Sequence, residues 1–425
     1  MVPATPLGPT YRKLFTASAL SNLADGIFQV ALPLLALRIT RSPGAVAGVA
    51  LAGRLPWLLF ALQAGALADR LDRLRTMVRV DLARIVLIGG LAVVVAVEHE
   101  SMPVLYVVAF ALGIGETLFD TAAQSIIPMV VGRDDLDRAN GRMYGTEMVM
   151  NQFVGPPLGG VLAGVALALA FTGSAFAYLV ALGALLTIKG SFRPSRDGEV
   201  PARLRTDIAE GLRYLMGHRL LRTMAFMVGV MNLCTAAVFG LLPLYAVDPG
   251  PMGLSETGYG IFLTAGACGA VLGSWTASWM VRVLGRSRLL LFSVLTTAGM
   301  LAAPLATEPW VVAALFFVTH IGFMGWNVVT VSLRQRIVPE RLLGRLNASF
   351  RLVAWGTLPV GAALGGVLAE VFGLRSVFVV TAVIALGLVF CMPQLTNAKL
   401  DAAEAEAEPP AADPGPAEEA PVTTP

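Results

Sequence analysis

Charged residues are scarce in this 425-residue chain. Asp, Glu, Lys and Arg together make up 14% of it, whereas soluble domains contain about 25%. The formal net charge is only +3, and the basic residues lie in short segments between apolar runs. This composition excludes an ordinary soluble fold, and it leaves no basic surface for a nucleic-acid partner.

Residues that bind metals or perform covalent catalysis are also rare. The three cysteines, Cys234, Cys268 and Cys391, fall inside apolar runs without the spacing of metal ligands, and we interpret them as small buried residues. The sequence contains no GxxxxGK[ST] phosphate loop, no HExxH motif and no serine elbow. We therefore expect no cofactor, no metal and no enzymatic activity, and active transport by this chain must draw on an ion or substrate gradient.

Apolar sequence, by contrast, is abundant and makes up 56% of the chain. It forms runs of about 20 residues, long enough for a helix to cross about 30 Å of hydrocarbon. We predict an all-α integral membrane protein with twelve transmembrane helices. The predicted spans are 14–37, 44–67, 78–97, 103–128, 145–167, 171–188, 222–246, 257–281, 289–306, 310–333, 350–371 and 375–392.

An even number of spans places both termini on one side of the membrane, and the basic residues identify that side. If the termini are cytoplasmic, the outer hinges hold only Arg38, Arg41 and Arg375 of the 31 basic residues. We therefore predict a multi-pass protein of the inner (plasma) membrane with cytoplasmic termini. The N-terminus lacks a signal-cleavage pattern, so the first span must also direct insertion.

The spans divide into two groups of six. The predicted parts are a cytoplasmic N-terminus (1–13), an N-terminal half (14–188), a cytoplasmic linker (189–221), a C-terminal half (222–392) and an acidic tail (393–425). In the linker, Leu212, Leu215 and Met216 recur at helical spacing among charges, which predicts an amphipathic helix on the membrane lipids; a solvated linker is the alternative. The tail has almost no large apolar residue, and we expect it to be disordered.

The two groups are internal copies. Three motifs recur in the same order: GPPLGGVLA (155–163) as GAALGGVLA (361–369), DRAN (137–140) as GRLN (344–347), and Gln124 with Pro128 as Gln335 with Pro339. Parallel six-helix halves are typical of one large transporter class, in which the binding site lies between the halves near mid-bilayer. We therefore expect alternating access by rocking of one half against the other.

Two motifs carry a resemblance to a known family. GALADRLDRLR (65–75) resembles the signature of the major facilitator superfamily, and GPPLGG (155–160) is similar to its antiporter motif. The stretches LADGIFQVALPLLALRIT, LFDTAAQSIIPMVVGRDDLDRANGRM and EGLRYLMGHRLLR resemble the branch that includes macrolide and enterobactin efflux proteins. The resemblance implies the major facilitator fold and efflux of drugs, antibiotics or siderophore-like compounds.

The hinge 65–75 is a candidate conformational latch, because it places a carboxylate beside guanidiniums at a helix end. Its predicted residues are Gly65, Asp69, Arg70 and Arg73. Asp72 stands where the family usually has Gly, so we expect a stiffer hinge. The second copy, RVLGRSR (282–288), has no acid, which predicts a one-sided latch. The alternative is that these arginines serve only to orient the chain in the membrane.

The fifth span offers a candidate helix-packing gate. Its small and helix-bending residues are Gly155, Pro156, Gly159 and Gly160. They give a surface that can pack tightly, and we expect it to seal the inner side. The resemblance implies that this seal favours export. Asn151 stands where the longer family pattern has another Gly, and a purely structural packing role is the alternative.

Charged side chains inside the spans are candidates for proton coupling, because each costs at least about 2.5 kcal/mol at mid-span. Asp25 lies halfway along the first span, with Gln29 on the same face. We expect Arg54 in the second span to be its partner. The alternative is a static ion pair that holds helices together.

The fourth span carries Glu116, Asp120 and Gln124 at four-residue intervals, and therefore on one stripe. We predict Asp25 and Glu116 as the protonation sites. Asp81 and Arg84 are interpreted as a local pair. Weaker cavity candidates are Asn151, Asn232, His320 and Asn327, although a lone His in a span is more often a hydrogen-bonded core residue.

Carboxylates, amides and aromatics such as Trp57 and Trp326 favour an apolar or weakly cationic substrate. The sequence therefore predicts a secondary active efflux transporter, functional as a monomer, that exports an amphipathic small molecule in exchange for protons. A proton-coupled nutrient importer of the same fold is the alternative. An integral-membrane enzyme would need a catalytic constellation, which the sequence lacks.

Overall fold

The computed structural model describes residues 7–68, 71–132, 135–190, 192–193 and 204–407. These residues are helical apart from loops and one isolated β-bridge between Val247 and Leu254. The first part contains α1 (Pro9–Ile39), α2 (Pro43–Ala68), α3 (Arg73–Ala96), α4 (Met102–Val130), α5 (Leu136–Met148), the π-helix η2 (Val149–Val154), α6 (Gly155–Val165) and α7 (Leu167–Leu186).

The second part follows the same plan. It contains α8 (Leu204–Gly217), α9 (Arg219–Phe239), α10 (Leu242–Ala246), α11 (Glu256–Leu284), α12 (Arg286–Ala302), the 3₁₀ turn η3 (Ala303–Leu305), α13 (Pro309–Ile337), α14 (Glu340–Phe372), α15 (Leu374–Gly387), the 3₁₀ turn η4 (Leu388–Gln394) and α16 (Asn397–Ala407). Gly285 and Gly373 separate consecutive helices with φ values of 80° and 82°, which L-residues rarely adopt.

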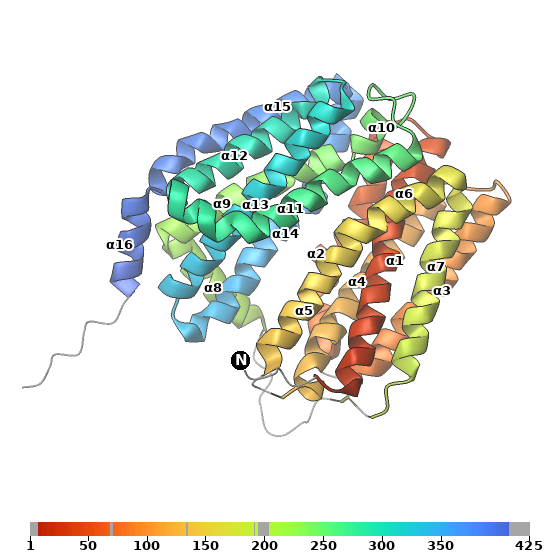
Figure 1. The fold of residues 1–425 in the computed structure, drawn as a ribbon, viewed down its shortest axis with the longest axis horizontal. Helices are drawn as coiled ribbons and strands as arrows, with labels where there is room; N and C mark the ends of the chain where they lie inside the picture. The colour runs from red at the N-terminus through yellow and green to blue at the C-terminus, as the bar shows by residue number, and fades with distance from the viewer. Residues whose placement is uncertain (1–6, 69–70, 133–134, 191, 194–203, 408–425) are drawn as a thin grey trace, which may run out of the picture.

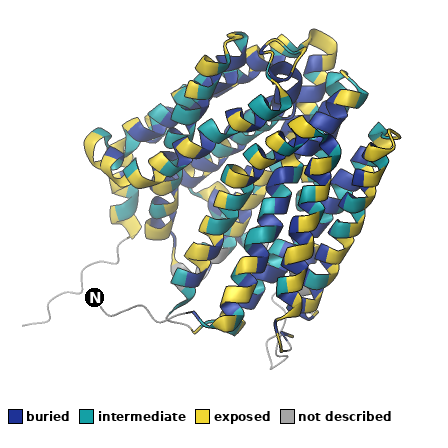
Figure 2. Ribbon diagram, turned by 45° about the vertical axis from the view of Figure 1, so that its right-hand side comes forward, coloured by how far each residue is buried: buried dark blue, intermediate teal, exposed yellow. Residues whose placement is uncertain are grey.

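Ten helices within the described ranges are long and apolar enough to span a membrane. The other two predicted spans coincide with α3 and with the run α5–η2–α6. α3 carries Arg79, Asp81 and Arg84 within its length, and η2 interrupts the fifth span. Trp275, Trp310 and Phe390 are more than 80% exposed. Figure 2 shows exposed positions recurring along the outward sides of the helices, as expected for a lipid-facing surface.

The helices form two neighbouring groups, α1–α7 and α9–α15 (Figure 1). We name the end of the bundle that carries the start of α1 and Asp72 the terminus end, and the opposite end, with Thr40 and α10, the far end. The groups meet mainly through α2 against α14 and α6 against α11. In Figure 1 their ribbons converge near α6 and α10 and diverge toward the terminus end.

Polar contacts between the two groups gather at the far end. Arg38 pairs with Glu256 at 3.4 Å, and Arg41 donates to the Asp248 carbonyl oxygen at 3.0 Å. The Glu370 carboxylate accepts from the Ser42 hydroxyl at 3.1 Å and from the Gly44 backbone N–H at 3.0 Å. A cavity of about 370 Å³ with an almost entirely apolar lining lies between α2 and α14 beside this contact.

The linker contains α8, which packs against α14. Leu215 of α8 is fully buried, and Glu210 pairs with Arg345. Leu212 and Met216 remain exposed. The apolar face is therefore shared between the protein and the surroundings, and its contact with lipid stays a prediction.

The acidic tail differs from the expectation for residues 397–407, which form α16 instead of a disordered segment. Leu400 is fully buried in a cluster that includes Met392 and Leu395. The remaining tail residues, 408–425, lie outside the described part of the chain. The helix-forming neighbours of Leu400 favour a short helix that packs on the second half.

Candidate transport site

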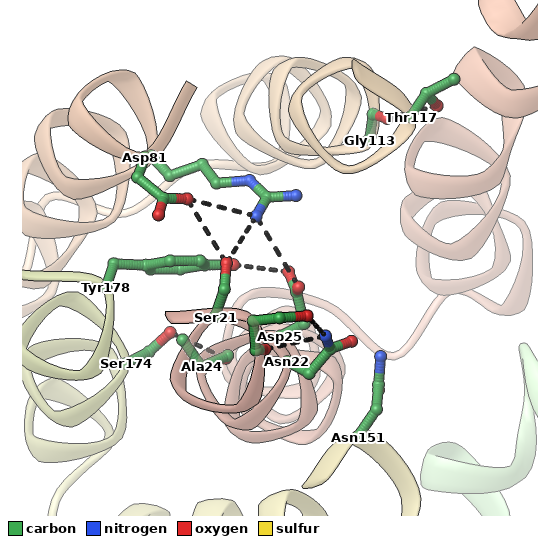
Figure 3. Close-up of polar contacts among 12 residues, drawn as sticks. Ser21, Asn22, Ala24, Asp25, Asp81, Gly113, Thr117, Asn151, Ser174 and Tyr178 are labelled. Carbon is green, nitrogen blue, oxygen red and sulfur yellow. Dashed lines mark hydrogen bonds and ion pairs between the residues drawn. The ribbon is translucent and has the colours of Figure 1, made fainter. Parts of the chain in front are cut away.

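A buried arginine stands at the centre of the first half. Arg84 of α3 is 1% exposed, and its Nη1 lies 3.8 Å from Asp25 Oδ2 of α1 and 3.7 Å from Asp81 Oδ1 (Figure 3). Asp81 is fully buried, whereas the Asp25 side chain keeps 16% of its exposure. One guanidinium is thus shared by two carboxylates from different helices.

Hydroxyl groups from α1 and α7 complete this arrangement. Tyr178 donates its phenolic hydrogen to Asp25 Oδ1 at 2.5 Å. Ser21 Oγ accepts from Arg84 Nη1 at 3.2 Å and donates to Asp81 Oδ1 at 3.3 Å. We name Ser21, Asp25, Asp81, Arg84 and Tyr178 the Arg84 cluster; Figure 3 shows the side chains converging between α1, α3 and α7.

Aromatic rings shield the guanidinium from the surroundings. Its carbon Cζ lies 5.3 Å from the ring centroid of Phe119 and 5.1 Å from that of Tyr178. Gly115 also keeps room for the side chain, since a Cβ there would lie 3.1 Å from Arg84 Nε. This enclosure makes charge neutrality important, because unpaired charges are costly in a low-dielectric site.

The Arg84 cluster has unused hydrogen-bonding capacity. Arg84 Nε and Nη2 and Asp81 Oδ2 are buried without a partner among the described residues. With Asp25 and Asp81 both ionised, one guanidinium faces two negative charges, so the cluster carries one charge in excess. A single proton on either carboxylate neutralises it.

The expected pairing of Asp25 with Arg54 is wrong. α1 packs mainly against α7 and α6, while α2 packs mainly against α4 and α14. Neighbours in sequence are therefore not neighbours in space here. Arg54 is exposed, and Asp25 pairs with Arg84 of α3 instead. Asp81 and Arg84 do form the predicted local pair, but sequence reasoning missed the connection from Arg84 to Asp25.

The carboxylate stripe of α4 lies next to the Arg84 cluster. Glu116 and Asp120 are half-buried, and both lie within electrostatic range of Asp25, Arg84 and Glu147 of α5. Gln124 is exposed one turn nearer the terminus end. The first half therefore concentrates carboxylates from α1, α3, α4 and α5 in one region.

The predicted amides divide into two sets. Gln29 Nε2 donates to Asn151 Oδ1 of η2 at 2.7 Å, so these two predicted residues meet. Asn232 donates to the Ala354 carbonyl oxygen, and Asn327 to the Phe323 carbonyl oxygen of its own helix. These second-half amides satisfy backbone groups and do not join the Arg84 cluster.

His320 is a hydrogen-bonded core residue, which was the alternative to a place in the cavity. Its Nδ1 lies 2.8 Å from the Phe316 carbonyl oxygen, and its ring packs where a Cβ on Gly266 of α11 would stand. Trp326, expected in the cavity, is 2% exposed and belongs to the second-half core. Trp57 of α2 instead meets Trp355 of α14, edge to face at 5.4 Å between ring centroids. This aromatic contact joins the two halves.

The hinge after α2 is only partly described. Gly65 lies near the end of α2, and Asp69 and Arg70 fall outside the described residues. Arg73 Nη1 donates to the Ser125 carbonyl oxygen of α4 at 2.9 Å. Asp72 accepts from the backbone N–H of Arg75 at 3.1 Å and of Phe192 at 3.3 Å. The acid in the usual Gly position therefore caps α3 and ties it to the chain after α7.

The GPPLGG motif packs as predicted, but at the other end of the bundle. Gly155, with Pro156 next to it, begins α6 against α1, and a Cβ on Gly155 would lie 2.5 Å from Gly26 Cα. A Cβ on Gly159 would lie 2.7 Å from the Ile27 carbonyl oxygen, and one on Gly160 2.7 Å from Gly260 Cα of α11. Since α6 is the far-end part of its span, the seal lies at the far end and not at the terminus end.

Sequence comparisons match both halves. A family model described as transmembrane secretion effector matches residues 3–423. The multidrug efflux pump Tap of Mycolicibacterium fortuitum is 29% identical over 393 residues, which cover 88% of this chain and 92% of that protein. The enterobactin exporter EntS of Salmonella typhi is 27% identical over 370 residues, covering 84% of this chain and 85% of that protein.

Solved structures share the fold. A bacterial homologue of the iron transporter ferroportin in an inward-facing state is 18% identical with a TM-score of 0.71, covering 91% of this chain and 98% of that chain. A bacterial homologue of the human lysosomal transporter Spinster, inward-facing and unoccupied, is 16% identical with a TM-score of 0.68, covering 96% and 100%. The predicted all-helical fold of two repeated halves is confirmed.

Proposed function

Because this chain belongs to the transmembrane secretion effector family, within the drug and siderophore exporter branch of the major facilitator superfamily, we propose that it exports an amphipathic organic molecule in exchange for protons. The names of Tap and EntS support efflux of drug-like or siderophore-like cargo. The protein acts as a monomer in the inner membrane, with both termini in the cytoplasm and no enzymatic step.

The observation that carries the proposal is the Arg84 cluster, in which one guanidinium is shared by the carboxylates of Asp25 and Asp81. Asp25 keeps partial exposure, while Arg84 and Asp81 are buried. Asp25 is therefore the carboxylate that a proton can reach and leave. Its protonation weakens the attraction to Arg84, and the guanidinium then pairs with Asp81 alone.

The coupling to helix movement runs through α1. Gly26 follows Asp25 directly and packs against Gly155 of α6 at a distance that admits no side chain. Five residues along α6, Gly160 meets Gly260 of the second half in the same way. A shift of α1 on protonation of Asp25 therefore moves α6 and changes its contact with the second half. Rocking of the two halves must open this contact.

With cytoplasmic termini, the far end is the outer end. The Arg38–Glu256 ion pair, the hydrogen bonds around it and the Gly160–Gly260 contact then close the outer side, as in an inward-facing state. This arrangement suits loading of cargo from the cytoplasm or from the inner leaflet. The carboxylate region and the Trp57–Trp355 pair favour a cargo with apolar surface and weak positive charge.

The test is transport by everted membrane vesicles that contain the protein, energised by an imposed pH gradient and screened with a panel of fluorescent amphipathic compounds. The proposal predicts uptake into everted vesicles that requires an acidic lumen. Asp25→Asn should abolish gradient-driven uptake, while the matched control Glu98→Gln, on an exposed loop residue, keeps it. Uptake only in right-side-out vesicles would identify an importer and overturn the proposal.

A further inference from the structure

The hinge between α11 and α12 is the second copy of the hinge between α2 and α3. Arg286 occupies the place of Arg73, and Gly285 the place of Asp72. In the first hinge, Arg73 reaches α4 by donating to the Ser125 carbonyl oxygen. In the second copy, the residue equivalent to Ser125 is Arg336 of α13, so a second guanidinium lies near Arg286 where the first half has a neutral serine.

Two carboxylates of α16 occupy this position. Glu404 pairs with Arg286 at 2.5 Å and with Arg336 at 3.3 Å, and it therefore bridges both guanidiniums. Asp401, three residues earlier on the same helix face, also pairs with Arg286. The second hinge has no acid of its own, but the C-terminal helix brings one to it.

The helix is held in place by more than these charges. Leu400 is fully buried against the second half. Asn397 Oδ1 accepts from the Ser287 backbone N–H of the hinge at 2.9 Å. Arg286 and Glu404 are each only about one-fifth exposed, with side-chain values of 20% and 21%. The Arg286–Glu404 pair is therefore better shielded than an ordinary surface ion pair, whereas Asp401 and Arg336 are exposed, with side-chain values of 66% and 65%.

We propose that α16 is the acidic part of a second charge latch, in which Asp401 and Glu404 join Arg286 of the α11–α12 hinge to Arg336 of α13, and that transport requires this docking. The latch fixes the terminus end of α13 to the hinge. Without it, Arg286 and Arg336 repel each other, and the terminus end of α13 loses this charge link to the hinge. The inference rests on the proposed transport function, whereas docking itself can be measured without transport.

The experiment compares the full-length protein with Asp401→Asn/Glu404→Gln, with truncation after Thr396, and with the control Glu406→Gln on the same helix. Transport is measured in everted vesicles, and hydrogen exchange at residues 397–407 and in α13 is measured in detergent. The double variant should expose α16 to exchange and lower transport about fivefold, the change that about 1 kcal/mol produces.

Full transport by the truncated protein would overturn the proposal. Unchanged protection of α16 in the double variant would overturn it as well, because the charges would then not be what docks the helix. If the full-length protein fails to transport any probe, the proposed function is wrong, and the exchange data still decide whether α16 docks through Asp401 and Glu404. Full-length protein without protection at 397–407 would refute the latch.

Discussion

Arg84 and Asp25 face each other across α3 and α1, with 3.8 Å between Nη1 and Oδ2, although 59 positions separate them in the chain. The pair is not isolated, since Asp81 shares the guanidinium and Tyr178 holds the other oxygen of Asp25. This geometry makes Arg84 the residue that links α1, α3 and α7 in the first half.

Replacement of Arg84 by Gln should destabilise the protein, because the buried Asp81 and the half-buried Asp25 then lose the guanidinium that they share. Breaking one partner of a buried ion pair costs roughly 3–5 kcal/mol. Thermal unfolding in detergent, followed by tryptophan fluorescence, measures the effect. Arg54→Gln is the matched control, since Arg54 is exposed and should leave the unfolding temperature nearly unchanged. Equal losses in the two variants would remove the special role of Arg84.

Asp25→Asn should have the opposite profile: folding is preserved and gradient-driven export is lost. The amide keeps the shape and can accept from Tyr178, and the excess negative charge disappears. Vesicle transport should therefore be lost, while the unfolding temperature stays unchanged or rises. A parallel fall of both quantities would show that Asp25 is only a structural partner of Arg84.

Gly160→Ala should prevent the close contact between α6 and α11 that closes the far end. A Cβ there would lie 2.7 Å from Gly260 Cα, a distance that forces the two backbones apart. We expect a strong loss of transport with normal membrane insertion, measured as export rate per inserted protein. Gly183→Ala of α7 is the control, because its Cβ meets no atom within 4 Å. Wild-type export by the Gly160 variant would mean that the halves do not need this contact.

Asp72→Ala should loosen the hinge before α3. The carboxylate caps the helix at Arg75 and also accepts from Phe192, so its loss removes two hydrogen bonds. Loss of a helix cap alone costs about 1 kcal/mol. Hydrogen exchange in the first turn of α3 reports the change, and Asp72→Asn should retain most of the protection. Equal exchange in the alanine variant and the native protein would contradict the capping role.

His218 should make the start of α9 sensitive to acid. Its Nδ1 accepts from the Leu221 N–H at 3.4 Å, and burial lowers the pKa of the imidazole. Because the folded state favours the neutral ring, the contribution to stability is present above the unfolded pKa of about 6.5 and is lost as the pH falls through the lower, folded value. Exchange at the start of α9 between pH 7.5 and 5 measures this, and His218→Asn should remove the pH dependence.

Hydropathy and the repeats predicted the architecture, because span length and parallel duplication are imposed by the membrane and are visible in one sequence. The Arg84 cluster was missed because Asp81 and Arg84 satisfy a local i, i+3 interpretation, and no sequence rule says that α3 lies beside α1. A usable signal existed. Two fully buried ionisable residues in one span are expensive, and each should have been assigned a partner in another helix.

The tail shows a second limit. Its overall composition predicts disorder, and this average concealed an 11-residue segment, NAKLDAAEAEA, of helix-forming residues with one leucine. The acidic residues at positions 401 and 404 share a face only once the segment is helical. The absence of an acid in the α11–α12 hinge was the available clue, because a basic hinge without its own partner indicates one supplied from elsewhere.

The single excess charge of the Arg84 cluster also bears on membrane voltage. If one proton enters for each neutral molecule exported, every cycle moves one net charge inward, and a potential of 100 mV then adds about 2.3 kcal/mol to the driving force. Export of a monovalent cation by the same exchange moves no net charge and gains nothing from the potential. Neutral and cationic cargoes of one exporter would therefore respond differently when the voltage collapses while the pH gradient persists.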